Sequence, residues 1–200
     1  MTGASLLVVL AAGCQHGTDT TSPQPTVPTA AVTWQGFTDG CPTLTAPPYG
    51  IDAHGKGYPD YIAPGEQDVL DKVIPGASFD QTYCSFKTAG ADLPVLGADV
   101  RIFRGANGAS QVDTLFQVEK SAAKKIAGVD YADAPQLGDD AFAWYFQSQL
   151  HMTARSGNAY IVIQVLLDKQ VTKTFDVLQP LPPQVPALSK VMTDLLAELH

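Results

Sequence analysis

The chain is poor in positive charge, histidine and cysteine, and each shortage excludes a class of function. Its 12 Lys and Arg residues are outnumbered by 20 Asp and Glu residues, which gives a formal net charge of −8. Nucleic acid and anionic lipid headgroups would repel such a chain, so neither is expected as a direct partner. None of the four histidines lies at ligand spacing from Cys41 or Cys84, which argues against a zinc site.

A long hydrophobic run is also missing near the start of the chain. The apolar stretch there covers only residues 4–12. At 1.5 Å per residue in a helix, it spans less than half of a hydrocarbon core about 30 Å thick. A retained transmembrane helix is therefore disfavoured.

What the N-terminus has instead is the order of a bacterial lipoprotein signal. A short apolar core leads through Ala11, Ala12 and Gly13 directly into Cys14. Such a signal is cleaved before the cysteine, whose thiol and new N-terminus carry lipid. We therefore expect residues 1–13 to be a signal peptide and Cys14 to bear a diacylglyceryl group, with palmitate as a typical acyl chain. An ordinary secretory signal and a chance apolar start are the alternatives, because residues 1–5 lack the usual Lys or Arg.

The segment after Cys14 is rich in Thr, Ser and Pro and has almost no large apolar side chain. It cannot bury enough surface to offset the entropy lost on ordering. We expect residues 14–40 to be the lipidated cysteine and a flexible tether. Residues 41–200 are then a single domain on the extracytoplasmic face of the cell membrane, attached to it through the lipid.

Cys41 and Cys84 remain once Cys14 is lipidated. An even number of cysteines in an oxidising compartment favours a disulfide between them. Two unpaired buried thiols or a metal site are the alternatives.

Periodicity predicts an α+β domain with an antiparallel sheet of about five strands and helices packed mainly on one face. A short helix is expected after Pro64, a longer helix after Gly108 and a final helix over the apolar stripe Leu188 to Leu199. The expected strands cover residues 79–86, 95–103, 141–147, 150–154 and 160–167, with a turn at Gly157 and Asn158 between the last two.

Within the long helix, Ser110 is placed to cap the N-terminus, with Asp113 three residues later. Glu119 falls at the edge of the apolar stripe. We interpret it as a solvated rim residue rather than as a buried functional carboxylate.

Motifs for catalysis are absent. The elbow G-x-S-x-G of many hydrolases does not occur, and Asp139 and Asp140 are better explained as turn residues than as an acid–base pair. Asp52, His54 and Asp60 share an irregular segment that could meet around a cation, but its Gly and Pro content favours a loop. We expect no enzyme activity, no metal and no cofactor.

Binding of a ligand is harder to exclude. Five aromatic residues could line a groove, with three arginines offering contacts to an anion: Tyr49, Tyr58, Tyr61, Trp144, Tyr145, Arg101, Arg104 and Arg155. Aromatics that alternate across a sheet and arginines that keep strand edges soluble are the simpler interpretation.

Several short motifs are similar to one family. They are the lipoprotein cysteine with its Thr/Pro tether, Gly40-Cys41-Pro42, Tyr83-Cys84-Ser85-Phe86, Leu137-Gly138-Asp139-Asp140-Ala141-Phe142 and Arg155-Ser156-Gly157-Asn158. Together they resemble the DUF3558-type lipoproteins of the actinobacterial cell envelope, a family of unknown function. The resemblance implies a Cys41–Cys84 disulfide and an extracytoplasmic α+β domain, and it carries over no catalytic residue.

The sequence therefore predicts a lipid-anchored module that binds or senses a small ligand, an envelope component or a partner protein. An envelope hydrolase and a structural accessory subunit of an envelope complex are the alternatives.

Overall fold

The computed structural model describes residues 32–62, 66–88, 95–126, 128–134, 136–146, 149–166 and 181–200. These residues belong to one compact unit, Ala31–His200. The predicted signal peptide, Cys14 and most of the predicted tether lie outside the described residues, as do Pro64, Gln147 and Leu167.

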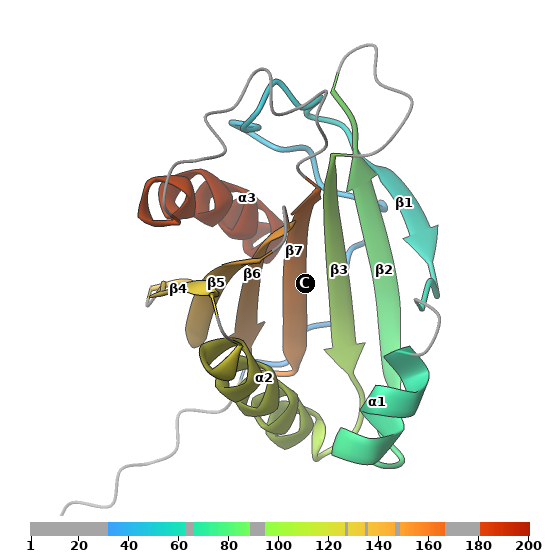
Figure 1. Ribbon diagram of the computed structural model, residues 1–200. Helices are drawn as coiled ribbons and strands as arrows, with labels where there is room; N and C mark the ends of the chain where they lie inside the picture. Colours follow the sequence, from blue (N-terminus) through green and yellow to red (C-terminus); the bar gives the residue numbers. More distant parts are fainter. Residues whose placement is uncertain are drawn as a thin grey trace, which may run out of the picture. The chain divides into compact units, whose positions relative to one another are not determined.

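A single antiparallel sheet of seven strands forms the centre of this unit, in the order β1-β2-β3-β7-β6-β5-β4 (Figure 1). The strands are β1 (Lys56–Pro59), β2 (Phe79–Phe86), β3 (Leu96–Phe103), β4 (Asp130–Asp133), β5 (Asp140–Phe146), β6 (Gln149–Ser156) and β7 (Ala159–Leu166). The α+β class and the antiparallel sheet are confirmed. The five predicted strands correspond to β2, β3, β5, β6 and β7.

The two further strands lie at the edges of the sheet. All four residues of β1 are exposed, and β4 has only four residues, two of them aspartates. Short, polar edge strands bury little apolar surface, so they leave no clear alternation in the sequence. Their pairing with β2 and β5 is what defines them.

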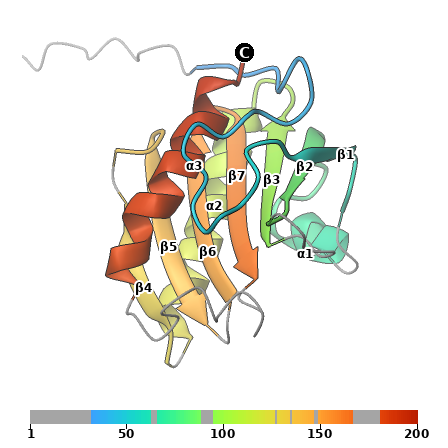
Figure 2. The same ribbon diagram turned by 90° about the horizontal axis from the view of Figure 1, so that it is seen from above.

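The helices cover both faces of the sheet. α1 (Glu66–Val73) and α2 (Gly108–Lys125) lie on one face, and α3 (Val185–Ala197) lies on the other (Figures 1 and 2). α3 follows a short 3₁₀ turn, Pro182–Gln184, and completely buries Leu188, Val191, Met192 and Leu195. Two of the three helices thus share the face on which we expected most of them.

The strands differ in character on their two faces because side chains alternate. On the α3 face β3 presents Ala98, Val100 and Ile102, all buried in the larger core cluster. On the α1/α2 face the same strand presents Asp99 and Arg101. The α3 side is therefore a conventional apolar core, whereas the other side mixes apolar and charged groups.

The long helix α2 begins at Gly108, two residues before the predicted cap. Asn107 occupies the N-cap position, and no side chain makes a capping hydrogen bond. The Ser110 prediction is therefore wrong. A side chain added at Gly108 would collide with the carbonyl of Phe103, so the close approach of β3 and the helix start requires glycine there.

The predicted disulfide is present. Cys41 and Cys84 are bonded, with Cα atoms 5.6 Å apart. Cys84 lies on β2 and is completely buried in the α3-side core. The bond fastens the loop before β1 to the sheet.

Within residues 32–40, which we assigned to the tether, Trp34 contacts the end of the sheet. The backbone N–H of Trp34 donates to Oδ1 of Asn158 at 2.6 Å, and its indole N–H donates to Ser156 Oγ at 3.2 Å. Trp34 also packs against the α3-side core. Partial burial of this indole, with its N–H hydrogen-bonded, fixes this part of the chain against the sheet, whereas the Thr/Pro-rich residues 15–31 lie outside the described residues. No helix among the described residues is long and apolar enough to cross a membrane.

Candidate functional site

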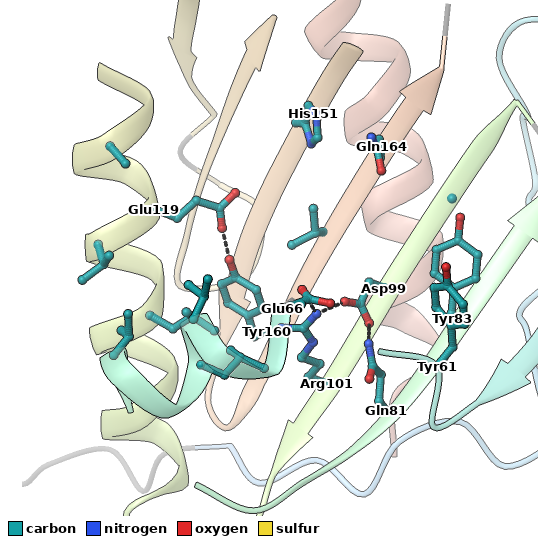
Figure 3. A pocket seen from close by; sticks show the side chains of 18 of the residues that line it. Tyr61, Glu66, Gln81, Tyr83, Asp99, Arg101, Glu119, His151, Tyr160 and Gln164 are labelled. Atoms are coloured by element: carbon teal, nitrogen blue, oxygen red, sulfur yellow. Dashed lines mark hydrogen bonds and ion pairs between the residues drawn. The ribbon is translucent and has the colours of Figure 1, made fainter. Parts of the chain in front are cut away.

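A cavity of about 530 Å³ lies between α1, α2 and the sheet face that they cover (Figure 3). This volume falls in the range of small-molecule sites. The helices supply its walls and the strands supply its floor. We call it the α1/α2 pocket.

The walls are apolar. Val69, Leu70 and Val73 come from α1, and Leu115, Val118 and Ala122 come from α2. Leu70 and Leu115 are buried, whereas Val69 and Val118 are about half exposed at 54% and 47%. The pocket therefore has an apolar rim that is open to solvent.

The floor is polar because β2, β3, β6 and β7 place alternate residues there. Arg101 on β3 is almost completely buried and forms ion pairs with Asp99 on the same strand and with Glu66 at the start of α1. Burial raises the pKa of Asp99, and the guanidinium of Arg101 opposes that shift. Asp99 and Arg101 lie two residues apart on the same face of β3, and Glu66 approaches from α1, so the arginine bridges the two carboxylates.

Glu119 on α2 reaches over the floor from the opposite side. Its carboxylate accepts a hydrogen bond from Thr153 Oγ1 at 2.9 Å and another from the hydroxyl of Tyr160 (Figure 3). Burial raises its pKa to about 7, partly offset by the Thr153 hydrogen bond and by Arg101. The residue is half-buried overall, but its carboxyl group is held inside the pocket. Our interpretation of Glu119 as a solvated rim residue is therefore wrong.

Three buried polar atoms of the pocket lining lack partners, and two of them belong to Gln81 and Arg101. Gln81 Nε2 donates to Asp99 Oδ1 at 2.6 Å, which fixes the orientation of the amide. Its other atom, Oε1, is buried with no hydrogen-bond partner, as is Nε of Arg101. A buried acceptor without a partner costs free energy unless something supplies a donor.

Aromatic side chains complete the floor and one side of the mouth. Tyr61 and Tyr83 have ring centroids 5.1 Å apart, and Trp144 stacks on His151 with centroids 4.0 Å apart. Burial lowers the pKa of His151 to about 4, so its imidazole is neutral near pH 7. The indole Nε1 of Trp144 is close enough to Glu119 to favour the ionised carboxyl, yet it has no partner in hydrogen-bond geometry.

The residues that we singled out as a groove are only partly brought together. Tyr61, Trp144 and Arg101 line the pocket. Tyr49 and Tyr145 pack against the core on the α3 side instead, and Tyr58 is an exposed residue of the edge strand β1.

The two other arginines of that set pair with acidic residues elsewhere. Arg104 pairs with Asp80 at the end of the sheet, and Arg155 lies near Asp113 and Asp139. No arginine of the predicted set is thus left to bind an anion in the pocket.

The polar floor residues Gln81, Tyr83, Asp99 and Tyr160, together with Glu66, were missed. A signal was present in β3, where Asp99 and Arg101 stand two residues apart in an otherwise apolar strand; Gln81 and Tyr83 have the same spacing in the more polar β2. A polar stripe on one face of a central strand points to a solvated cavity on that side.

The other chemical candidates do not assemble. Asp139 accepts a hydrogen bond from the N–H of Gly157, whereas Asp140 pairs with Lys120, so the adjacent carboxylates face different partners. His54 hydrogen-bonds Thr43 in the irregular segment. Across the described residues, no group of three or more His, Cys, Asp or Glu side chains is arranged to hold a metal ion.

Comparison of the chain with models of protein families, with curated proteins and with solved structures finds no match in any of the three.

Proposed function

We propose that this protein is an extracytoplasmic binding module that holds a small ligand in the α1/α2 pocket. A lipid on Cys14 anchors it to the cell membrane, as in the actinobacterial envelope lipoproteins that its motifs resemble. The observation that carries the binding role is the pocket itself, with apolar walls and a floor of buried polar groups.

The floor is preorganised for binding. Arg101 is fixed by two carboxylates, Gln81 by Asp99, and Glu119 by Thr153 and Tyr160. A ligand that enters such a site does not have to order the side chains that contact it, which favours affinity. A purely structural role would not explain a cavity lined with these fixed polar groups.

Hydrolysis by a nucleophile is less well supported. Thr153 is the hydroxyl residue bonded to Glu119, but it is completely buried beneath the floor and so is not accessible to a substrate. His151 has the Gln149 side chain at 3.3 Å and stacks on Trp144, which leaves no hydroxyl or thiol paired with it among the described residues.

One observation favours a second candidate. The pKa of Glu119, about 7, is suited to general acid–base catalysis near neutral pH. An envelope enzyme that uses Glu119 as its proton donor is therefore the alternative function. Turnover of a bound ligand that is lost in Glu119→Gln would support it over simple binding.

The pocket can be tested by blocking it. Ala122 lines the mouth from α2 and is exposed, so Ala122→Trp fills the entrance without disturbing the core. Ser121→Trp, on the exposed side of the same helix, is the matched control. Native mass spectrometry of the protein purified from its own envelope should show a co-purifying mass with wild type and Ser121→Trp but not with Ala122→Trp. A mass retained by Ala122→Trp would place the ligand elsewhere and contradict the proposal.

The anchor is tested separately. Cys14→Ser should move the protein from the membrane fraction to the soluble envelope fraction or the medium, because the acyl chains provide its hold on the bilayer. Unchanged membrane retention would contradict lipid anchoring at this residue. The Cys41–Cys84 disulfide is consistent with an oxidising compartment and supports this location only weakly.

A further inference from the structure

We propose that the ligand of the α1/α2 pocket is an organic cation, a primary ammonium group carried on an apolar stem. This inference rests on the proposed function, since it names the chemical class that the same pocket binds. The charge of the floor, the aromatic lining and the apolar walls point to it.

The ionisable groups of the pocket do not balance. Arg101 carries one positive charge and is already paired with Glu66 and Asp99, which carry two negative charges. Glu119 adds a third carboxyl group, and His151 is neutral near pH 7. Among the described residues that line the pocket there is no lysine. A cation restores the balance of charge on this floor, whereas an anion worsens it.

Three buried polar atoms of the lining lack partners and do not decide between a cation and an anion, because Gln81 Oε1 is an acceptor whereas Arg101 Nε and Trp144 Nε1 are donors. Gln81 is 5% exposed, and its Oε1 has no hydrogen-bond partner. The hydrogen bond from its Nε2 to Asp99 prevents the amide from turning to offer a donor instead.

The aromatic lining favours a cation as well. Tyr61 and Tyr83 lie side by side at one end of the pocket, with ring centroids 5.1 Å apart and ring planes tilted by 43° (Figure 3). A cation over the faces of such rings gains roughly 0.5 to 2 kcal/mol depending on its desolvation. A neutral or anionic group gains nothing comparable from them.

The walls decide what is attached to the ammonium group. Leu70, Leu115 and the half-exposed Val69 and Val118 rise from the floor to the rim. An alkyl or aryl stem against these residues is removed from water, whereas a polar stem would lose hydration without finding partners. A polyamine or a simple inorganic cation therefore fits less well than an amphiphilic amine.

Three probes of one shape test the charge directly. Hexylammonium, 1-hexanol and hexanoate share the stem and differ in the head group. Isothermal titration calorimetry near pH 7.5 should give an affinity for hexylammonium at least about ten-fold tighter than for 1-hexanol, equivalent to about 1.4 kcal/mol, with hexanoate weakest. Equal affinities, or hexanoate binding most tightly, would overturn the cation inference.

Variants locate the effect. Glu119→Gln keeps the shape and one of the two acceptor oxygens but removes the charge, so it should weaken hexylammonium binding about ten-fold and leave 1-hexanol unchanged. Glu198→Gln makes the same change on the exposed end of α3 and should alter neither. An equal loss with both variants would mean that net charge, not the pocket, attracts the amine, which overturns the inference.

Proton release gives a second readout. The groups around Glu119 are Thr153, Tyr160, Trp144, Arg101 and Glu66. An added cation stabilises the carboxylate of Glu119, so binding near pH 7 should release a fraction of one proton, seen as a dependence of the binding enthalpy on the buffer. Proton uptake, or no buffer dependence, would contradict placement of the cation at Glu119.

Failure of this inference is distinguishable from failure of the proposed function. If none of the three probes binds, the cation inference falls. A co-purifying mass that is lost in Ala122→Trp would then still support the pocket as a binding site. If 1-hexanol and hexanoate bind as well as the amine and Ala122→Trp blocks all three, the pocket binds apolar stems without selecting charge.

Discussion

Trp144 on β5 and His151 on β6 form a cross-strand pair whose rings stack face to face, with centroids 4.0 Å apart and planes within 1° of parallel. The indole shields one face of the imidazole from water. This contact explains why burial dominates the titration of His151 and lowers its pKa to about 4. A neutral imidazole on the floor is part of what keeps positive charge out of the pocket.

The first prediction is that the lowered pKa of His151 makes the folded protein less stable at acid pH. The unfolded chain binds a proton at its ordinary pKa near 6.5, whereas the folded chain does not bind it until about pH 4. The contribution of His151 to stability is therefore present above pH 6.5 and is lost as the pH falls towards 4. Between about pH 7.5 and pH 5 the loss is about 2 kcal/mol. In urea unfolding, the free energy of unfolding of His151→Gln relative to that of wild type should therefore rise by about 2 kcal/mol as the pH falls from 7.5 to 5.

Glu119 should produce the opposite dependence, which is the second prediction. Its pKa is about 7 in the fold and 4.5 for a glutamate free in water, so its contribution to stability is present below pH 4.5 and is lost as the pH rises through 7. As the pH falls from about 7.5 to about 5, the free energy of unfolding of wild type should therefore rise by about 2 kcal/mol relative to that of Glu119→Gln, as measured by urea unfolding.

The two groups nearly cancel in the wild-type chain. The opposite effects of these two residues should leave the free energy of unfolding almost independent of pH over this range. Each single variant removes one effect, so its free energy of unfolding should show the pH dependence caused by the other residue. Parallel profiles for Glu119→Gln and wild type would show that Glu119 titrates normally in the fold.

The fold was largely readable from the sequence because its helices bury one apolar stripe and its central strands are mostly apolar on both faces. Phe142 and Trp144 alternate with buried alanines in β5, and the turn at Gly157 and Asn158 joins two strands whose side chains alternate in the same way. Such patterns fail where no face is buried. The exposed strand β1 has no buried face to generate a pattern, and its pairing with β2 depends on the fold.

The site was much less readable, and Glu119 shows why. Its position at the edge of the α2 stripe is compatible with solvent or with a cavity, and only the placement of Tyr160 and Thr153 beneath it decides between them. These partners lie on β7 and β6, far from α2 in sequence. The pocket exists because α1 and α2 diverge over the sheet, and helix packing distance is not encoded in hydrophobic periodicity.

The third prediction tests the disulfide as a source of stability. Cys41 and Cys84 are separated by 43 residues, and in the chain-entropy model a loop of that size stabilises the fold by roughly 4 kcal/mol. Cys41→Ser avoids placing a polar hydroxyl at the fully buried Cys84. Denaturant unfolding of this variant should show a loss of that order. A midpoint unchanged by Cys41→Ser or by reductant would contradict the role assigned to the bond.

The fourth prediction tests the contact between Gly97 and Tyr83, neighbouring residues on β3 and β2. A Cβ at Gly97 would collide with the hydroxyl and ring of Tyr83, so Gly97→Ala should displace that ring from the pocket and cost about 1 to 3 kcal/mol. Tyr83→Ala removes the obstacle. In a double-mutant cycle the Gly97→Ala substitution should therefore cost less in the Tyr83→Ala background. Equal costs in both backgrounds would mean that the strain lies in the backbone instead.

The fifth prediction concerns Arg101, the buried cation that holds two carboxylates. Arg101→Gln leaves Asp99 and Glu66 without their counter-charge and should destabilise the protein by about 3 to 5 kcal/mol at neutral pH, as expected when one partner of a buried pair is lost. Burial already raises the pKa of Asp99, and without Arg101 it should rise further. The penalty should therefore shrink as the pH falls and Asp99 takes up a proton, and Asp99→Asn should rescue part of it near pH 7. A penalty that is the same at all pH values and is not relieved by Asp99→Asn would show that Arg101 acts through packing of its aliphatic stem rather than through its charge.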